Sequence, residues 1–314
     1  MLQDLLGLSH WQPAFAQPVT RLGAGGVRVY ENVHTQQGET DWQVAIDQLE
    51  AALTQQTSFN GFVDTSLVSS SQIERTLSAG TTSPATNLED LFNKLRALSA
   101  NPGNGASLKS AVTSAQAVSS AFNSASASLS QLRGGLDSSI TSTVGQINAI
   151  AQQIAGLNGQ ISTLTSQGVS PNSLLDQRGQ LVNNLAKLVD VQVQNGNNGQ
   201  INIIVSGAAL VAGTQSVGLT AGGDALGAAT VSVAGTDTPL SISGGQLGGF
   251  LSQRNQTLAD FQARLDSLAR QVAVSFNAVQ STGAGSNGGF TELYQTVCVK
   301  PSTGLVNRGF RKYQ

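Results

Sequence analysis

The sequence has few charged residues. Asp, Glu, Lys and Arg together make up 11% of its 314 residues, whereas soluble domains usually contain about 25%. The 16 basic and 18 acidic residues leave a net charge of −2, and the basic residues form no run. Nucleic acid is therefore not expected as a partner. Ser, Thr, Gln and Asn fill the positions between apolar residues, and such a neutral polar surface can pack against copies or partners.

Residues that commonly bind metals or carry out catalysis are also scarce. Cys298 is the only cysteine, which excludes an internal disulfide and a multi-cysteine metal site. His10 and His34 are the only histidines, and neither belongs to an HxH or HExxH motif. The paired glycines are not followed by the Lys-Ser/Thr of a phosphate loop, and no G-x-S-x-G motif occurs. We therefore predict no enzyme, no metal site and no cofactor.

Long apolar runs are missing as well. The most apolar stretch, INIIVSGAALVAG (201–213), is broken by Ser and Gly and falls short of the about 20 residues that a membrane span requires. The sequence therefore predicts no membrane insertion. The first residues, MLQDLLGLSHWQPAFA, carry an acidic residue where a secretory signal needs a basic region. A cleaved signal peptide is not expected, and export would need another route.

Apolar residues at helical spacing occur on both sides of the middle of the chain. They begin at Trp42, Ile46, Leu49 and Leu53, with a second short segment at Ile73. Thr86 to Glu89 matches a capping box and predicts the start of another helix. Residues 105–166 keep a near-heptad spacing that predicts a rod of about 90 Å, with a kink or break at Gly134-Gly135.

The spacing of the apolar residues changes twice after residue 166. Ser170-Pro171 predicts the start of a helix that extends to Leu188. VDVQV (189–193), the turn at 195–199 and QINIIV (200–205) predict a β-hairpin, because residues alternate with a period of two. Further strands are expected near 209–212, 229–234 and 239–242. The helical period returns from 246 to 280.

These patterns predict an α+β fold: an elongated antiparallel bundle of long helices with a small β-rich inserted domain. The apolar faces of 105–166 and 246–280 cannot be buried alone, so we expect them to pack together. The predicted division is an atypical N-terminal segment (1–40), the first part of a helical rod (41–188), a β-rich insert (189–245), a returning helix (246–280) and an atypical C-terminal tail (281–314).

No catalytic residue is proposed, and the candidate residues are structural. Asp176 and Arg178 lie two residues apart on different helix faces, so they cannot pair and each is expected to reach a neighbouring helix. The other candidates are apolar residues that should pack in the core. The complete set is Leu174, Asp176, Arg178, Leu181, Leu251, Leu258, Phe261 and Leu265.

Several blocks resemble the flagellar hook-associated protein 1 family. PNSLLDQRGQLVNNLAKLVDVQVQNGNNGQINIIVSGAALVAG (171–213) is similar to the family's N-x-LLDQRD-x-L helix and the hairpin that follows it. NAIAQQIAGLNGQI (148–161), LEDLFNKLRALSANPGN (88–104) and the run at 244–280 occur in the family's order, and the resemblance covers about 62–290. Gly179 stands where the family usually has Asp.

The resemblance implies a structural protein that assembles as a ring at the hook-filament junction. It implies export through the flagellar type III apparatus without a cleaved signal peptide, to an extracellular location. Implied partners are copies of the chain, the hook protein, hook-associated protein 3 and a flagellar export chaperone. Residues 1–40 and 291–314 depart from the family's terminal helices, so we expect a shortened copy.

Two other interpretations remain open from the sequence. One is another axial rod protein, such as a flagellin, hook-associated protein 3 or a phage tail component, because these share the neutral, coiled-coil composition. The other is a secreted hydrolase. A deep pocket lined by Asp, Glu or His would favour the hydrolase, and a helical rod without such a pocket would not.

Overall fold

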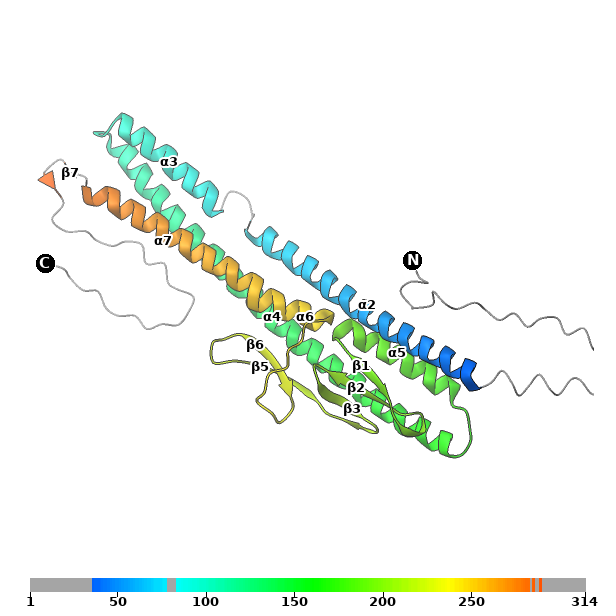
Figure 1. Cartoon of the computed structure of the whole chain (residues 1–314). Helices are drawn as coiled ribbons and strands as arrows, with labels where there is room; N and C mark the ends of the chain where they lie inside the picture. Colours follow the sequence, from blue (N-terminus) through cyan, green and yellow to red (C-terminus); the bar gives the residue numbers. More distant parts are fainter. Residues whose placement is uncertain (1–35, 78–82, 283, 286–287, 290–314) are drawn as a thin grey trace, which may run out of the picture.

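The structure, a computed structural model, describes residues 36–77, 83–282, 284–285 and 288–289. Both histidines, Cys298 and most of the two predicted end segments lie outside these residues. The helices are α2 (Gln36–Leu77), α3 (Pro84–Ala100), α4 (Gly105–Ser166), α5 (Asn172–Leu188), α6 (Gly245–Ser252) and α7 (Leu258–Thr282). None of the helices in the described part of the chain is both long and apolar enough to cross a membrane. Figure 1 shows α4 running along most of the length of the molecule, with the other helices beside it.

Helices α2 and α3 differ in their bounds from the sequence prediction. The segments around Trp42 and Ile73 belong to one helix of 42 residues, not two. Helix α3 begins at Pro84, because the Ser83 side chain accepts a hydrogen bond from the Thr86 backbone amide (3.2 Å). The capping box predicted at Thr86 is therefore wrong. Ser83 supplies the cap and Pro84 the first turn, where a missing amide costs nothing.

Helix α4 is continuous through Gly134 and Gly135, so the predicted kink or break there is wrong. A glycine in a helix costs about 1 kcal/mol relative to alanine. The residues on either side compensate for this cost, since Leu129 and Ile140 are buried. The expected apolar stripe is buried or half-buried from Phe122 onward but not at the start of the helix, where Leu108 and Val112 are exposed.

The β region follows α5, as the change of period predicted. Strands β1 (Gln192–Asn195), β2 (Ile201–Val205), β3 (Ala208–Ala212) and β4 (Gln215–Ser216) form an antiparallel sheet in that order. A separate hairpin pairs β5 (Leu219–Gly223) with β6 (Ala229–Val233). The segment predicted as a strand near 239–242 contributes only an isolated bridge between Pro239 and Ser232. Two short strands, β7 (Ala284–Gly285) and β8 (Gly288–Gly289), follow α7.

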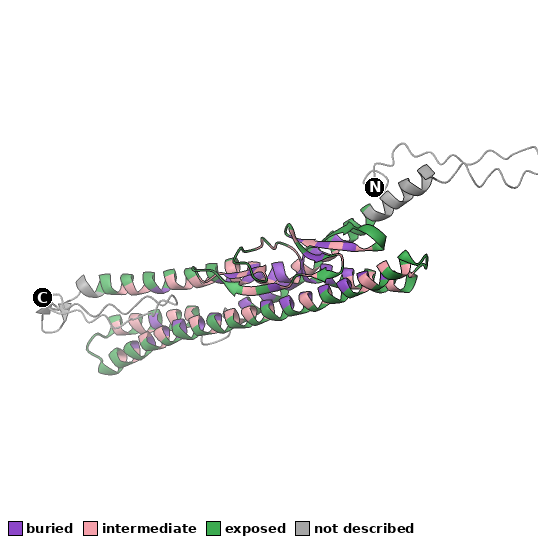
Figure 2. Ribbon diagram, turned by 90° about the horizontal axis from the view of Figure 1, so that it is seen from below, coloured by how far each residue is buried: buried purple, intermediate pink, exposed green. Residues whose placement is uncertain are grey.

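The largest core lies where the strands cover the helices. Its buried residues come from α4, α5, the strands and α6, and they include Ile147, Ile154, Leu185, Ile203 and Leu247. Figure 2 shows the buried residues concentrated in this middle part of the molecule. Two smaller clusters continue along the rod, one at Leu91 and Phe122 and one at Leu129 and Leu258. The α+β fold class predicted from the sequence is therefore confirmed.

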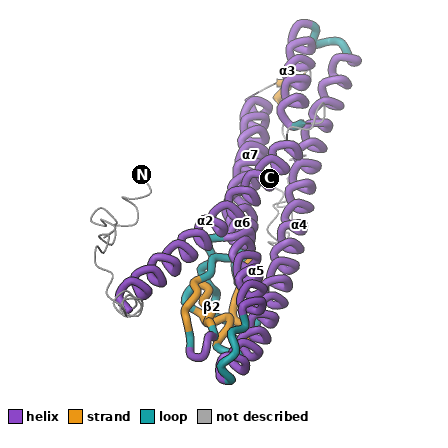
Figure 3. Tube along the Cα trace, turned by 90° about the vertical axis from the view of Figure 1, so that its right-hand side faces the viewer, coloured by secondary structure: helices purple, strands orange, loops and turns teal. Residues whose placement is uncertain are grey.

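Helix α2 crosses α5 and α6 at very short distance. A Cβ atom added to Gly61 would collide with the Lys187 carbonyl oxygen, and one added to Gly249 would lie 2.9 Å from the Thr65 Cβ. Glycine is therefore required at both positions for the backbones to approach this closely. Figure 3 shows that the first part of α2 leaves the bundle at an angle from this crossing.

Candidate functional site

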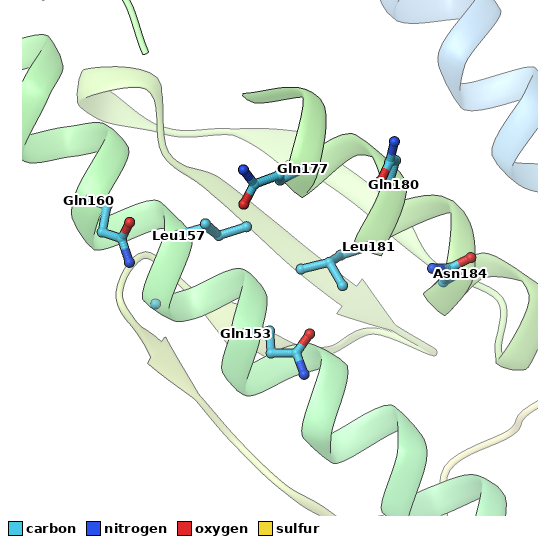
Figure 4. Close-up of a pocket in the computed structure, with 8 residues that line it drawn as sticks. Gln153, Leu157, Gln160, Gln177, Gln180, Leu181 and Asn184 are labelled. Atoms are coloured by element: carbon cyan, nitrogen blue, oxygen red, sulfur yellow. The ribbon is translucent and has the colours of Figure 1, made fainter. Parts of the chain in front are cut away.

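A groove of about 500 Å³ lies between α4 and α5. Its lining residues are Gln153, Gly156, Leu157, Gln160, Gln177, Gln180, Leu181 and Asn184. Figure 4 shows the amide side chains around Leu157 and Leu181. None of these side chains titrates, so the groove supplies no general acid or base. It lacks the Asp, Glu or His lining that would have favoured a hydrolase.

A second hollow of about 480 Å³ lies between α3 and α4, and it includes Asp90 and Lys94. These two residues form an exposed ion pair at 3.6 Å, and Asp90 also accepts a hydrogen bond from Ser114 (2.6 Å). Within the described ranges, no three His, Cys, Asp or Glu side chains are grouped so that they could hold a metal ion. The polar side chains that form the most extensive hydrogen bonds lie elsewhere, between the helical rod and the strands.

Asn158 forms the most deeply buried of these contacts. It is fully buried on α4, and its side-chain nitrogen donates to the carbonyl oxygens of Ile201 and Gly213, both at 2.7 Å. Its side-chain oxygen accepts from the Ile201 amide (3.2 Å) and from Arg178 (2.9 Å). A single carboxamide thus uses both donors and both acceptor positions. It joins α4, α5 and two points of the sheet.

Arg178 on α5 completes this cluster. Besides Asn158, its guanidinium donates to the carbonyl oxygen of Gly199 (2.6 Å), in the turn that precedes β2. Desolvation by burial lowers the pKa of Arg178, but an arginine remains charged at neutral pH. Hydrogen bonds from a charged donor are stronger than neutral ones, so Arg178 holds the turn firmly against α4 and α5.

Two further asparagines hold the β5–β6 hairpin. On α4, Asn148 donates to the carbonyl oxygen of Leu219 (2.9 Å) and accepts from its amide (2.8 Å). Asn255, in the five-residue π-helical turn between α6 and α7, makes the same pair of bonds with Ala229, both at 2.8 Å. In each case the carboxamide takes the place of a neighbouring strand. The first residues of both strands are therefore bonded to the rod.

The loop between β5 and β6 is held by two arginines. Arg254 lies in the π-helical turn and donates to Asp137 (2.8 Å) and to the Gly227 carbonyl oxygen (2.6 Å). Arg133 donates to the same carbonyl oxygen at 2.8 Å. The Arg254 side chain is only 10% exposed, and π-helical turns redirect side chains at such points. The hairpin tip is thereby attached to α4.

The residues singled out from the sequence are distributed between these contacts and the core. Arg178 lies in the asparagine cluster, whereas Asp176 is exposed and forms no hydrogen bond or ion pair with another described residue. Asp176 therefore does not reach a neighbouring helix. The remaining candidates line the helices: Leu251 and Leu258 are buried, and Leu174, Leu181, Phe261 and Leu265 are half-buried.

Sequence reasoning missed the three asparagines, although two of them had a detectable signal. Asn158 falls between Ile154 and Ile161 at heptad spacing, where an apolar residue is expected. A polar residue at such a core position indicates a buried hydrogen-bond partner. Asn255 falls between Leu251 and Leu258 in the same way. Asn148 had no such signal, and its partner strand β5 does not alternate and was not predicted.

These contacts define the class of protein. It is an elongated helical bundle in which a small β region is fixed to the side of the rod by carboxamide and guanidinium groups. The asparagine and arginine side chains of these contacts form hydrogen bonds with backbone groups of the same chain. Such bonds hold the β region in place on the helices.

Comparisons with known proteins give the same architecture. Residues 70–292 match the family described as "Flagellar hook-associated protein FlgK helical domain". The solved structure of the flagellar hook junction protein FlgK from Burkholderia pseudomallei is 33% identical, with a TM-score of 0.67, over 77% of this chain and 46% of that one. Because the family match covers more than half of the sequence, the chain belongs to the FlgK family of flagellar hook-associated proteins.

Two curated relatives show how far the similarity extends. Flagellar hook-associated protein 1 of Escherichia coli (strain K12) is 32% identical over 297 residues, covering 91% of this chain and 53% of the relative. The Bacillus subtilis (strain 168) protein of the same name is 28% identical over 260 residues, covering 73% and 51%. The chain thus spans about half the length of these relatives. The alignment with the Escherichia coli protein extends beyond residues 62–290, on which the sequence resemblance was based.

Proposed function

We propose that this chain is a structural component of the bacterial flagellum and contributes to the junction between hook and filament. The observation that carries the proposal is the family match over residues 70–292, together with the shared fold of a solved hook junction protein. The shape agrees with an axial role, because a long rod with a neutral polar surface can pack laterally against copies of itself. No catalytic role is proposed.

The contacts between the helical rod and the strands support this structural role. An axial component must keep its shape while force acts on the assembly, and a β region attached only by apolar contacts could slide along the rod. Asn148, Asn158 and Asn255 bond to both backbone groups of one strand residue each. Such paired, directional bonds fix the position of the strands along α4 and the π-helical turn.

The finer parts of the proposal concern organisation, location and partners. We propose a rod formed by 41–188 and 246–280 with a β-rich insert at 189–245. The chain would leave the cell by flagellar type III export without a cleaved signal peptide. It would then contact copies of itself, the hook protein and hook-associated protein 3, with an export chaperone bound beforehand.

Localisation of an epitope-tagged chain in its source bacterium tests the proposal. We expect gold-labelled antibodies to mark the boundary between hook and filament in electron micrographs of isolated flagella. The neutral variant Gln152→Ala should give the same labelling, because Gln152 is exposed on α4. Label along the whole filament would favour a flagellin-like role, and flagella without label would contradict the proposal.

Export is tested separately in the culture medium. We expect the chain to be found outside the cell with its N-terminus uncleaved by mass spectrometry, and to be retained when the flagellar export machinery is deleted. Secretion that continues in the deletion strain would contradict the export route without affecting the assignment to the junction.

A further inference from the structure

The loop between β5 and β6 presents a leucine to solvent. Leu226 is 95% exposed, more than any other large apolar side chain among the described residues. Single exposed apolar residues are common on protein surfaces, whereas the tips of exposed loops are usually formed by polar or small residues. Leu226 differs from an ordinary exposed residue because the loop holds it in one position.

Hydrogen bonds fix the loop on both sides of Leu226. The Asp224 side chain accepts from the backbone amides of Leu226 (2.9 Å) and Ala228 (2.7 Å). The Gly227 carbonyl oxygen accepts from Arg133 (2.8 Å) and from the arginine of the π-helical turn (2.6 Å). A partner that buries Leu226 would therefore not have to order the loop first, and such preorganisation favours binding.

The groove between α4 and α5 is a hollow of matching character. Leu157 and Leu181 are half-buried, and Figure 4 shows them pointing toward one another. Gly156 leaves the groove open, because a Cβ atom added there would meet no other atom within 4 Å. With a volume of about 500 Å³, the groove can accept a leucine side chain together with the apex of its loop.

The amide side chains of the groove can bind the backbone of such a loop. The five that line it form no hydrogen bond with another described residue. A carboxamide has both donors and acceptors, and Asn148 and Asn255 already bind the backbone groups of strand residues in this chain. The groove thus combines an apolar contact for a side chain with free partners for backbone groups.

Leu226 does not reach the groove of its own molecule. Arg133, which contacts the loop, and Leu157, in the groove, are separated by about 36 Å along α4 at 1.5 Å per residue. Figure 1 shows the β5–β6 hairpin beside the middle of α4, whereas α5 lies toward the end of α4. A contact between Leu226 and the groove therefore joins two molecules. Because it pairs two different surfaces, it leads to a ring or an open chain of copies rather than to a closed dimer.

Neither surface would bury an unbalanced charge in this contact. The groove is lined only by Gln, Asn, Leu and Gly. Beside the loop, the two arginines Arg133 and Arg254 are balanced by Asp137 and Asp224. Burial of an unpaired charge is costly, and two copies of this chain avoid that cost. The chain's own loop and groove therefore suit each other, which favours a second copy as the occupant of the groove.

We propose that Leu226 of one copy inserts between Leu157 and Leu181 in the α4–α5 groove of a neighbouring copy. This inference rests on the proposed function, in which copies of the chain contact one another, and it names the residues of that contact. One loop in one groove buries less than the about 1,000 Å² of a stable interface. The contact therefore forms at high concentration or within an assembly.

Cysteine cross-linking of the full chain tests the proposal. Cys298 is replaced by serine in all proteins, one batch carries Leu226→Cys, and a second batch carries Gln180→Cys in the groove. A disulfide needs Cα atoms within about 7 Å, so the mixed batches, concentrated and oxidised, should give at least about fivefold more mixed dimer than Leu226→Cys with Gln116→Cys. Gln116 is exposed near the other end of α4. Equal yields would overturn the proposal.

Filling the groove gives a second test. Gly156→Phe, added to the Gln180→Cys chain, should reduce the mixed dimer to the control yield, because the ring occupies the space that Leu226 needs. Gly179→Phe is the matched control on α5, since Gly179 is exposed, lies outside the groove lining and also has no atom within 4 Å of an added Cβ. Circular dichroism confirms that both variants fold. An undiminished yield with Gly156→Phe would contradict the groove as the binding site.

The Leu226→Cys chain by itself reports on a different arrangement. If two loops met across a two-fold axis, this chain alone would form as much dimer as the mixture with Gln180→Cys, and the groove assignment would be wrong. The result is also separable from the proposed function, because purified protein is used. A chain that marks the hook-filament boundary without the groove cross-link contradicts this contact only, and a cross-linked chain that is absent from the flagellum contradicts the proposed function only.

Discussion

At position 158, an asparagine occupies the place where the apolar spacing of α4 calls for a leucine or isoleucine. It is tolerated there because every polar atom of its side chain has a partner, on Ile201, Gly213 or Arg178. A buried amide that is fully bonded costs little, whereas its loss leaves several buried groups unpaired. The residue therefore determines where the sheet sits on the rod.

We predict that Asn158→Ala lowers the free energy of unfolding by about 3 kcal/mol. The reason is that the amide and carbonyl of Ile201 and the carbonyl of Gly213 would lose their partner, at about 1–3 kcal/mol for each buried group left unsatisfied. Urea unfolding followed by circular dichroism measures this. Gln152→Ala on the exposed side of α4 should change stability by no more than about 0.5 kcal/mol. Equal effects of both substitutions would show that the cluster does not contribute.

At the scale of the elements, the glycines of α4 and α6 differ in the space around them. Gly134 is exposed, and a Cβ atom added there meets no other atom within 4 Å. Gly249 faces α2, where an added Cβ would lie 2.9 Å from Thr65 and 3.1 Å from the Phe62 carbonyl oxygen. From the sequence, both are glycines within a helical pattern, and the neighbouring helix alone distinguishes them.

We predict that the two glycines respond oppositely to the same substitution. Gly134→Ala should stabilise the protein by about 0.5–1 kcal/mol, because alanine is the better helix former. Gly249→Ala should destabilise it by about 1–3 kcal/mol, because α2 and α6 must separate. Thermal unfolding of the two variants gives the comparison. A gain in stability for Gly249→Ala would show that the crossing is looser than its distances indicate.

For the molecule as a whole, α4 sets the length. Its 62 residues span about 93 Å at 1.5 Å per residue, and helices α3, α5, α6 and α7 lie along it. The large core joins the C-terminal half of α4 to the strands, and the two smaller clusters follow one another toward the N-terminal end of α4. The molecule is therefore elongated because one long helix runs along it and each shorter helix packs against only a part of that helix.

We predict that this extension is measurable in solution. A compact globule of 314 residues would have a radius of gyration of about 20 Å, and small-angle X-ray scattering of the full chain should give a distinctly larger value. The maximum dimension should exceed about 90 Å, since α4 alone has that length. The elongated arrangement would be refuted by a radius of gyration close to that of the globule.

The spacing of apolar residues predicted most of the long helices, the hairpin at β1 and β2 and the return to helix after 245, because each of these depends on a local period. It did not predict that α2 is one helix. The sequence also determined the family, through the blocks around 148–213 and 244–280. Where local signals competed, the predictions were wrong: Thr86 was taken as the cap instead of Ser83, and Gly134-Gly135 as a break.

The contacts between these elements depend on the tertiary structure. Strand β5 lacks alternation, and its place is set by Asn148, which is 71 residues away in the sequence. The periodicity of α2 showed that Leu49 and Leu53 share a face but not that this face points outward. That outcome depends on Gly61 and Gly249, which allow the small polar face to approach its neighbours more closely than any leucine could. Contacts between residues far apart in the chain leave no period in the sequence, and therefore only the folded structure reveals them.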